Sequence, residues 1–306
     1  MRVEKGSAAH DLLGIWAIGC AYAPIALALI SFALWRNPWI YVLSFIVIGA
    51  RMHAISILAH DTYHRTLFRS RRVNDVLGMY LFSFPLGMRF LSMREKHLEH
   101  HRLVGTIDDP DRYYWDWSTE ERARFIVQML LSATGARYIL WVTRTLLGRP
   151  PSSVPSRRPA APIFKSSSRN PAELIKLVLV QCVLLGGFAV SLGWVWYFAL
   201  WIFPLISLAF LLGELRQFLE HARGGQLMVF HAGSVERFFL GSFNFHLHGF
   251  HHAFASEPWF RIPEIEKVAL KKEPGIVLAG SYFQELMRYL RGLPYSAFSP
   301  KQANAS

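Results

Sequence analysis

Histidine is grouped into three clusters whose spacing could support metal-ion chemistry. Within each cluster the histidines are three or four residues apart, a spacing that places them on one face of a helix. The clusters are His60 and His64, then His97, His100 and His101, then His248, His251 and His252. Neutral imidazole is a good ligand for iron, copper and zinc. Three helices that carry such clusters could therefore surround a pair of metal ions.

The combination of clusters is far more specific than any one of them. Histidine accounts for 13 of the 306 residues. At that frequency an H-x-x-x-H pair is expected by chance in about one of every two chains of this length. A given H-x-x-H-H is expected in roughly one chain in forty, and two together in about one in several thousand. The pattern therefore indicates a nitrogen-rich metal site.

Two further histidines lie near these clusters in the sequence. His221 follows Gln217 by four residues and shares its helix face, and this spacing leaves a ligand role and a surface role equally open. His246 precedes the third cluster, but His248 completes the H-x-x-H-H spacing. We therefore expect His246 to support a ligand or to lie at the surface. His10, before the first apolar run, is expected at a membrane interface.

Carboxylates and cysteines define the chemistry further. Metal-bound histidines usually donate their second N–H to a carboxylate or carbonyl, and Asp61, Asp109 and Asp111 are the expected acceptors. The two cysteines, Cys20 and Cys182, both lie in apolar runs. This placement argues against a disulfide framework, a thiolate zinc site and an iron–sulfur cluster.

The composition favours a membrane protein. Hydrophobic residues make up 52% of the chain and charged residues only 18%, and the mean hydropathy is +0.23. A soluble domain typically has about a quarter of its residues charged. The net charge of +12 does not indicate nucleic-acid binding, because the arginines are dispersed between apolar runs and form no basic face with aromatic residues.

Apolar runs near the length needed to cross a bilayer predict an all-α integral membrane fold. We expect two hairpins with short connections, formed by four spanning helices at about 12–35, 39–59, 174–192 and 194–213. The remaining chain is polar and should form a cap beyond the helix ends, made of residues 60–173 and 214–306.

Two further helices are expected within this cap. One covers 73–93 and is interrupted by Pro85, and the other, amphipathic, covers 121–147; both are predicted to lie at the membrane surface. Residues 149–171 are rich in Pro, Ser and Arg and are expected to form a flexible loop.

Basic residues predict the orientation of the spans. The N-terminal segment and the two cap segments hold 30 of the 33 lysines and arginines, and an even number of spans puts them on one side. The positive-inside rule makes that side cytoplasmic, most simply in a bacterial inner membrane. Arg51 and His53 fit this scheme poorly because they lie inside the second span. Either the membrane part of this helix is short, or Arg51 faces a polar interior in which Glu214 is a plausible partner. Snorkelling of Arg51 to the headgroups is equally open.

At this point the chain resembles the membrane fatty acid desaturase superfamily over about residues 12–270. The resemblance rests on an H-D-x-x-H after the second span and two later H-x-x-H-H boxes. It extends to flanking residues: Arg94-Glu-Lys-His97-Leu-Glu-His100-His101-Arg102, Thr106, Asp109-Pro110-Asp111, Asn244-Phe-His-Leu-His248 and Pro258-Trp-Phe-Arg-Ile-Pro263-Glu264. One departure is the Asn-Phe-His-Leu-His run, since a Tyr-His pair often precedes the last box. It leaves a choice of register between His246 and His248, and the spacing favours His248.

The resemblance implies four spanning helices and a cytoplasmic helical cap that holds two iron ions (Fe2+). It also implies that the histidine between the fourth span and the last box, His221, is a ninth ligand. A polar residue one turn earlier, Gln217, would hold a metal-bound water. No catalytic residues are expected beyond these positions.

The implied activity is O2-dependent desaturation of a fatty acyl chain linked to lipid, CoA or carrier protein. A hydroxylase or ketolase acting on a carotenoid or another alkyl lipid is the alternative, and the boxes do not separate the two. A histidine-rich metal transporter is disfavoured, because its ligands would lie near mid-membrane. The chain has no Rossmann, P-loop or Cys-x-x-Cys motif, so we expect a separate ferredoxin- or cytochrome-type electron donor, docked on the basic face.

Overall fold

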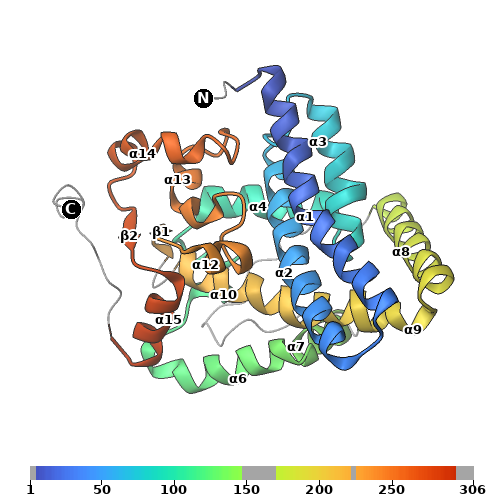
Figure 1. The fold of residues 1–306 in the computed structure, drawn as a ribbon. Coiled ribbons are helices and arrows are strands. Elements are labelled where there is room, and N and C mark those ends of the chain that lie inside the picture. The colour runs from blue at the N-terminus through green and yellow to red at the C-terminus, as the bar shows by residue number, and fades with distance from the viewer. Residues whose placement is uncertain (1–4, 147–169, 222–224, 294–306) are drawn as a thin grey trace.

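Four long apolar helices dominate the structure, a computed structural model that describes residues 5–146, 170–221 and 225–293. The helices long and apolar enough to cross a membrane are Ala8–Leu34, Pro38–Tyr63, Pro171–Ser191 and Trp194–Glu220. These correspond to α1, to α2, to α8, and to a continuous run from α9 to α10 (Figure 1). The four predicted spans are therefore confirmed as helices, and the fourth extends seven residues beyond its predicted end at Gly213.

Local sequence signals explain where the spans begin and turn. Asn37 caps α2 by accepting a hydrogen bond from the backbone N–H of Ile40, and Pro38 occupies the first turn, where its missing N–H costs nothing. Gly193, with φ of 108°, allows the chain to reverse between α8 and the next span.

The first two spans pack closely because α1 presents a stripe of small side chains. Its buried face includes Gly14, Ala17, Ala21 and Ala28, and α2 lies against it. Small residues permit close approach of helix backbones where lipid provides no hydrophobic driving force. Ser44 of α2 donates a hydrogen bond to the carbonyl of Ala28 at 3.0 Å.

The fourth span changes its helical geometry along its length. Its elements are α9 (Trp194–Tyr197), the π-helical turns η5 (Phe198–Ile202) and η6 (Leu205–Ala209), and α10 (Phe210–Glu220). Pro204 lies between the two π turns and cannot donate to the helix ladder, which accounts for the local rearrangement.

The segment after α2 forms a bent pair of helices. It consists of α3 (Arg71–Leu77), the π turn η1 (Gly78–Ser83), the 3-10 turn η2 (Phe84–Leu86) and α4 (Phe90–Leu103). The two arms meet at 99°. The sequence predicted an interruption at Pro85, but the break lies at Gly87, where φ is +67°. Pro85 itself is accommodated in the first turn of η2.

The end of η2 is buried between spanning helices, which differs from the predicted placement of 73–93 at the membrane surface. The carbonyl of Pro85 accepts hydrogen bonds from Trp201 at 3.0 Å and from Gln181 at 3.2 Å. Tyr22 of α1 donates to the carbonyl of Leu81. Because side chains of the spans satisfy these carbonyls, this end of the segment can lie at a depth where water is absent.

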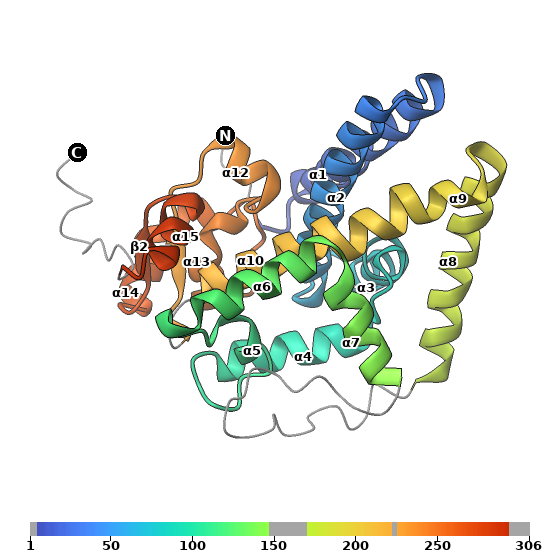
Figure 2. The same cartoon turned by 90° about the horizontal axis from the view of Figure 1, so that it is seen from below.

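The predicted helix at 121–147 is divided in two. Gly135 adopts φ of +75° and separates α6 (Arg122–Ala133) from α7 (Ala136–Leu146). A Cβ at Gly135 would lie 2.9 Å from a side-chain carbon of Ile206, so the position also permits close packing. Helix α6 runs alongside α10 (Figure 2). The loop predicted at 149–171 lies, but for its last two residues, outside the described residues.

The C-terminal elements gather at the end of the molecule opposite α8 and α9 (Figure 2). A two-stranded parallel sheet pairs β1 with β2, with Met228 opposite Val277. The remaining short elements are α5 (Arg112–Trp115), η3 (Thr119–Glu121), β1 (Met228–Phe230), α12 (Ser234–Phe239), η7 (Phe245–Leu247), α13 (His248–Ala253), η8 (Ile262–Glu264), α14 (Glu266–Lys272), β2 (Val277–Ala279) and α15 (Tyr282–Leu290).

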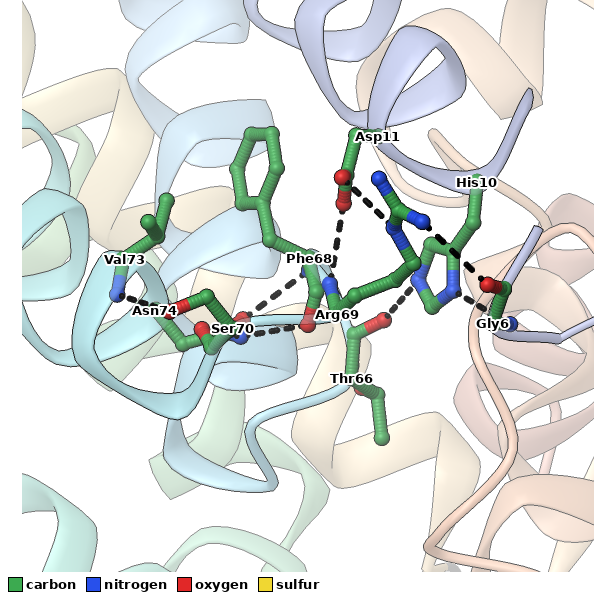
Figure 3. Close-up of polar contacts among 9 residues, drawn as sticks. All are labelled: Gly6, His10, Asp11, Thr66, Phe68, Arg69, Ser70, Val73 and Asn74. Atoms are coloured by element: carbon green, nitrogen blue, oxygen red, sulfur yellow. Dashed lines mark hydrogen bonds and ion pairs between the residues drawn. The ribbon is translucent and has the colours of Figure 1, made fainter. Parts of the chain in front are cut away.

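The start of α1 is tied to the chain that leaves α2 (Figure 3). His10 is buried there, and its place at a membrane interface stays a prediction. Its Nε2 lies 2.8 Å from the carbonyl of Thr66, and its Nδ1 accepts from the N–H of Gly6 at 3.3 Å. Asp11 accepts from both the backbone N–H and the guanidinium of Arg69. These contacts fix the segment that follows His64.

Arg51 faces a polar interior, which was one of its predicted environments, but the expected partner Glu214 does not contact it. The Arg51 side chain is buried, with the guanidinium 3.8 Å above the ring of Phe238 and hydrogen-bonded to the Phe238 carbonyl and to Ser242. Glu214 instead forms an ion pair with Arg137 at 2.9 Å. Arg51 is therefore accommodated by α12, which packs on the middle of α2.

Candidate metal centre

Four elements bring the predicted histidines together. The end of α2 carries His60, and His64 follows directly; α4 carries the second cluster and α13 the third. His221 follows the last residue of α10. The ring centroid of His60 lies 4.3 Å from that of His97 and 4.6 Å from that of His251, so α2 meets both α4 and α13 and segments nearly 200 residues apart in sequence face one another.

The histidines form two groups whose ligand atoms lie within 4.8 Å of one another. The first group is His60, His64, His97, His101 and His251, and the second group is His100, His221 and His252. The two groups are adjacent, because the rings of His101 and His252 stack with centroids 4.1 Å apart. His248 adjoins the second group, with its Nε2 3.0 Å from Nε2 of His252. All nine predicted ligands therefore converge.

Unsatisfied nitrogen atoms indicate that the cluster is built around cations. Buried ring nitrogens without a hydrogen-bond partner among the described residues are found in His60, His101, His221, His248, His251 and His252. Buried polar atoms are rarely left without a partner, and a metal ion accepts such lone pairs. An all-imidazole set suits iron, copper or zinc. The residues present thus fit a pair of iron ions.

The electrostatic environment keeps these rings neutral. Burial, followed by the charge of Arg94, lowers the pKa of His64 to about 4. Burial and the neighbouring rings lower the pKa of His101 to about 2 and those of His251 and His252 well below their ordinary value. The nitrogen lone pairs are therefore available for metal binding at neutral pH.

Buried carboxylates orient two of the histidines. Asp61 lies 3.2 Å from Nδ1 of His60, and Asp109 lies 2.8 Å from Nδ1 of His100. In each pair the carboxylate accepts the Nδ1–H, which leaves Nε2 as the free lone pair. The predicted contacts are confirmed for these two aspartates.

Asp111 does not contact a histidine, contrary to expectation. It forms an ion pair with Lys96, whose ammonium also lies over the rings of Tyr113 and Tyr114. Although burial alone would lower the pKa of Lys96, the Asp111 carboxylate raises it above its usual value. This pair fastens the turn that carries Asp109 to the helix that carries the second cluster.

The structure distinguishes His248 from His246. The ring of His246 turns toward the carbonyl of Gly241 and lies in neither group, whereas His248 stacks against Phe245 and His251 inside the cluster. A left-handed residue pair starts this segment: Phe243 and Asn244 have φ of +55° and +58°.

Gln217 fits its predicted position one turn before His221. Its Oε1 is buried and has no hydrogen-bond partner among the described residues. An unsatisfied acceptor beside the second group is what a bound water would require. The role of Gln217 remains a prediction.

One supporting network was not predicted. Glu220, adjacent to His221, is buried, forms an ion pair with Arg216 and accepts a hydrogen bond from Tyr282 at 2.8 Å. The guanidinium of Arg216 lies 4.3 Å from the ring centroid of Phe245. The i, i+4 spacing of Arg216 and Glu220 could have indicated their pairing, but no local pattern links Tyr282 to a residue 62 positions earlier.

Comparison with known proteins agrees with this geometry. The chain is 34% identical to a dihydrorhizobitoxine desaturase of Bradyrhizobium elkanii, over 33% of this chain and 29% of that protein. It is 24% identical to an sn-1 acyl-lipid omega-3 desaturase (ferredoxin) of Nostoc sp. (strain 36), over 63% and 54%. It is 33% identical to a beta-carotene ketolase of Paracoccus sp. (strain N81106 / MBIC 01143), over 28% and 38%.

In these three matches the aligned part covers between 29% and 54% of the relative's own length. A family model described as fatty acid desaturase matches residues 36–278, most of the chain, and this match shows the family. That range contains all nine histidines and three of the four long apolar helices in full. The chain is a membrane protein and belongs to the fatty acid desaturase family.

Proposed function

We propose that this protein is a di-iron oxidoreductase that desaturates a fatty acyl chain linked to lipid, CoA or carrier protein, using O2. The observation that carries the proposal is the convergence of nine histidines from four elements into two adjacent groups. The first group would hold one iron and the second group the other, with His248 at the second. Iron bound there supplies the oxidising power, drawn from O2, that breaking an unactivated C–H bond requires.

The chain's own residues contribute orientation and exclusion of water. Asp61 and Asp109 hold the rings of His60 and His100 in one tautomer. Five of the nine histidines are buried and the other four are half-buried, which limits the access of bulk water to the reacting centre. Reduction of O2 to water takes four electrons. Desaturation supplies two of them from the substrate, and a separate donor must supply the other two.

The proposed topology has two hairpins, α1–α2 and α8 to α10, with the polar segments and the metal centre on the cytoplasmic side. The distribution of lysine and arginine supports it. A bacterial inner membrane is the proposed location. Modification of single introduced cysteines from either side of sealed vesicles would test the orientation.

The proposed donor is a ferredoxin- or cytochrome-type protein that docks on the basic cytoplasmic face. The name of one relative includes ferredoxin, and the net charge of +12 would attract an acidic partner. Turnover with such a donor should slow as ionic strength rises. Turnover unaffected by salt would count against an electrostatic docking surface.

A second candidate is insertion of oxygen into a carotenoid or another alkyl lipid. A ketolase among the relatives favours it. Product mass separates the two: desaturation removes two hydrogens, hydroxylation adds one oxygen, and ketone formation adds one oxygen while removing two hydrogens.

The metal content of purified protein tests the centre itself. We expect about two irons per chain, lost in His100→Ala and His251→Ala and retained in His231→Ala, which changes an exposed histidine outside both groups. Stoichiometric zinc without consumption of O2 would overturn the proposal.

A further inference from the structure

A cavity of about 460 Å³ lies among the spanning helices, on residues that do not include any histidine of the metal centre. Its walls come from α1, the η1–η2 segment, α8 and η5, and α8 stands at the outer edge of the bundle in both views (Figures 1 and 2). The lining residues are Tyr22, Tyr80, Leu81, Pro85, Lys176, Leu179, Val180, Val183, Leu184 and Trp201. This volume is within the range of small-ligand sites.

The walls present mostly hydrocarbon, and the polar ring groups of two lining residues, Tyr22 and Trp201, are already hydrogen-bonded within the protein. The hydroxyl of Tyr22 donates to the carbonyl of Leu81, and the indole N–H of Trp201 donates to the carbonyl of Pro85 at 3.0 Å. A ligand of this groove must therefore be apolar along most of its length.

One charged group lines the groove, and among the residues that the structure describes it has no counter-charge. Lys176 is exposed and forms no hydrogen bond or ion pair with any residue that the structure describes. The nearby Glu173 instead faces Arg89, 3.5 Å away. The groove thus offers one unpaired cation at the edge of an apolar surface.

Lys176 lies in the second turn of α8, near the end at which this helix would enter a membrane. It lies five residues after Pro171, a rise of about 8 Å, whereas the apolar lining continues for eight more residues to Leu184, a further rise of about 12 Å. The site therefore has a cationic end near the polar interface and a hydrocarbon wall that runs into the membrane. An anionic amphiphile is complementary to both parts.

We propose that this groove binds an anionic phospholipid, with one acyl chain along α8 and its phosphate at Lys176. A phospholipid is the anionic amphiphile that a bilayer supplies at this depth. The site is separate from the metal centre and does not depend on the activity proposed above. It places a bound lipid between α1 and α8, two helices joined there through the side chains that hold η2.

Native mass spectrometry of the full-length protein tests this site. The protein is solubilised, exchanged into an equimolar mixture of phosphatidylglycerol and phosphatidylcholine in detergent, and analysed for retained lipid. We expect about one phosphatidylglycerol per chain. Lys176→Gln should reduce the preference for phosphatidylglycerol about fivefold, the size expected of one lysine near an anionic headgroup, and Lys176→Arg should retain it.

A pair of tryptophan variants on the same helix tests the groove. Val183→Trp places an indole at the lining and should abolish retention. Val190→Trp, at an exposed position outside the groove, should not. The melting temperature of each variant in detergent separates loss of lipid from loss of fold. Equal retention by both tryptophan variants, equal retention of the two lipids, or retention of a free fatty acid in place of a phospholipid would overturn the proposal.

Discussion

Substitution of Asp109 by asparagine should weaken iron binding, because this carboxylate serves three donors at once. Its Oδ1 lies 2.8 Å from Nδ1 of His100 and accepts from the backbone N–H of Asp111 at 2.8 Å; its Oδ2 accepts from the indole N–H of Trp115 at 3.2 Å. The side chains of Asp109 and His100 are almost fully buried. Water cannot replace either oxygen.

Asparagine has only one acceptor oxygen, so neither orientation of its amide can accept from both His100 and Trp115. If the oxygen faces His100, the NH2 group opposes the N–H of Trp115. If it faces Trp115, the NH2 group favours the His100 tautomer with the proton on Nε2, which removes the lone pair from the metal side. The loss of such a supporting contact typically lowers metal affinity 10- to 100-fold, or about 1.4–2.7 kcal/mol. The unsatisfied buried donor adds about 1–3 kcal/mol of destabilisation.

A second substitution tests whether competition from the Trp115 N–H causes the loss of iron affinity. In Asp109→Asn/Trp115→Phe the competing donor is absent, so the amide oxygen can face His100, and iron affinity should recover several-fold over Asp109→Asn. Iron affinity is measured by competition with a chelator of known affinity. Asp108→Asn, an exposed change next in sequence, is the control and should match the parent. Parental affinity in Asp109→Asn, or no recovery in the double variant, would refute the reasoning.

Three further outcomes follow from the geometry. Gly78→Ala should lower the free energy of unfolding by about 1–3 kcal/mol, because the added Cβ would overlap the ring of Phe90 in α4. Gly19→Ala is the control, since a Cβ there has nothing within 4 Å. Both are measured by chemical denaturation in detergent. His248→Asn should reduce iron content and His246→Asn should not; the reverse result would reverse the register. Burial lowers the pKa of His64 from 6.5 to about 4, so the folded, metal-free protein binds fewer protons than the unfolded chain in this window. Its melting temperature should therefore fall as pH falls from 6.5 towards 4, and a flat profile would contradict this.

The histidine boxes were predictable because helical spacing is a local property. An i, i+4 pair such as His60 and His64 fixes a shared face before any tertiary contact forms. The convergence of the boxes was predicted from chemistry, since imidazoles on several helices need a common ion. The division of the histidines into two groups was not predicted, because it depends on how α2, α4, α10 and α13 meet in the fold.

Contacts between distant segments were less predictable. Arg51 lies inside a predicted span, and Glu214 at the end of the fourth span was a plausible partner for it. In the structure a carbonyl and an aromatic ring of α12 accommodate the guanidinium. Backbone carbonyls and ring faces occur in every sequence and carry no pattern, so partners of this kind become visible only when the fold is known.

The fourth span shows why a helix can continue beyond the end of its apolar stretch. The predicted end at Gly213 marks the first charge, Glu214, and hydropathy detects where contact with lipid must end. The helix continues because each following charge is compensated inside the protein: Glu214 by Arg137, and Glu220 by Arg216 and Tyr282. That compensated extension carries Gln217 and positions His221, so the same ion pairs that allow the helix to leave the apolar region also deliver the ninth histidine to the metal centre.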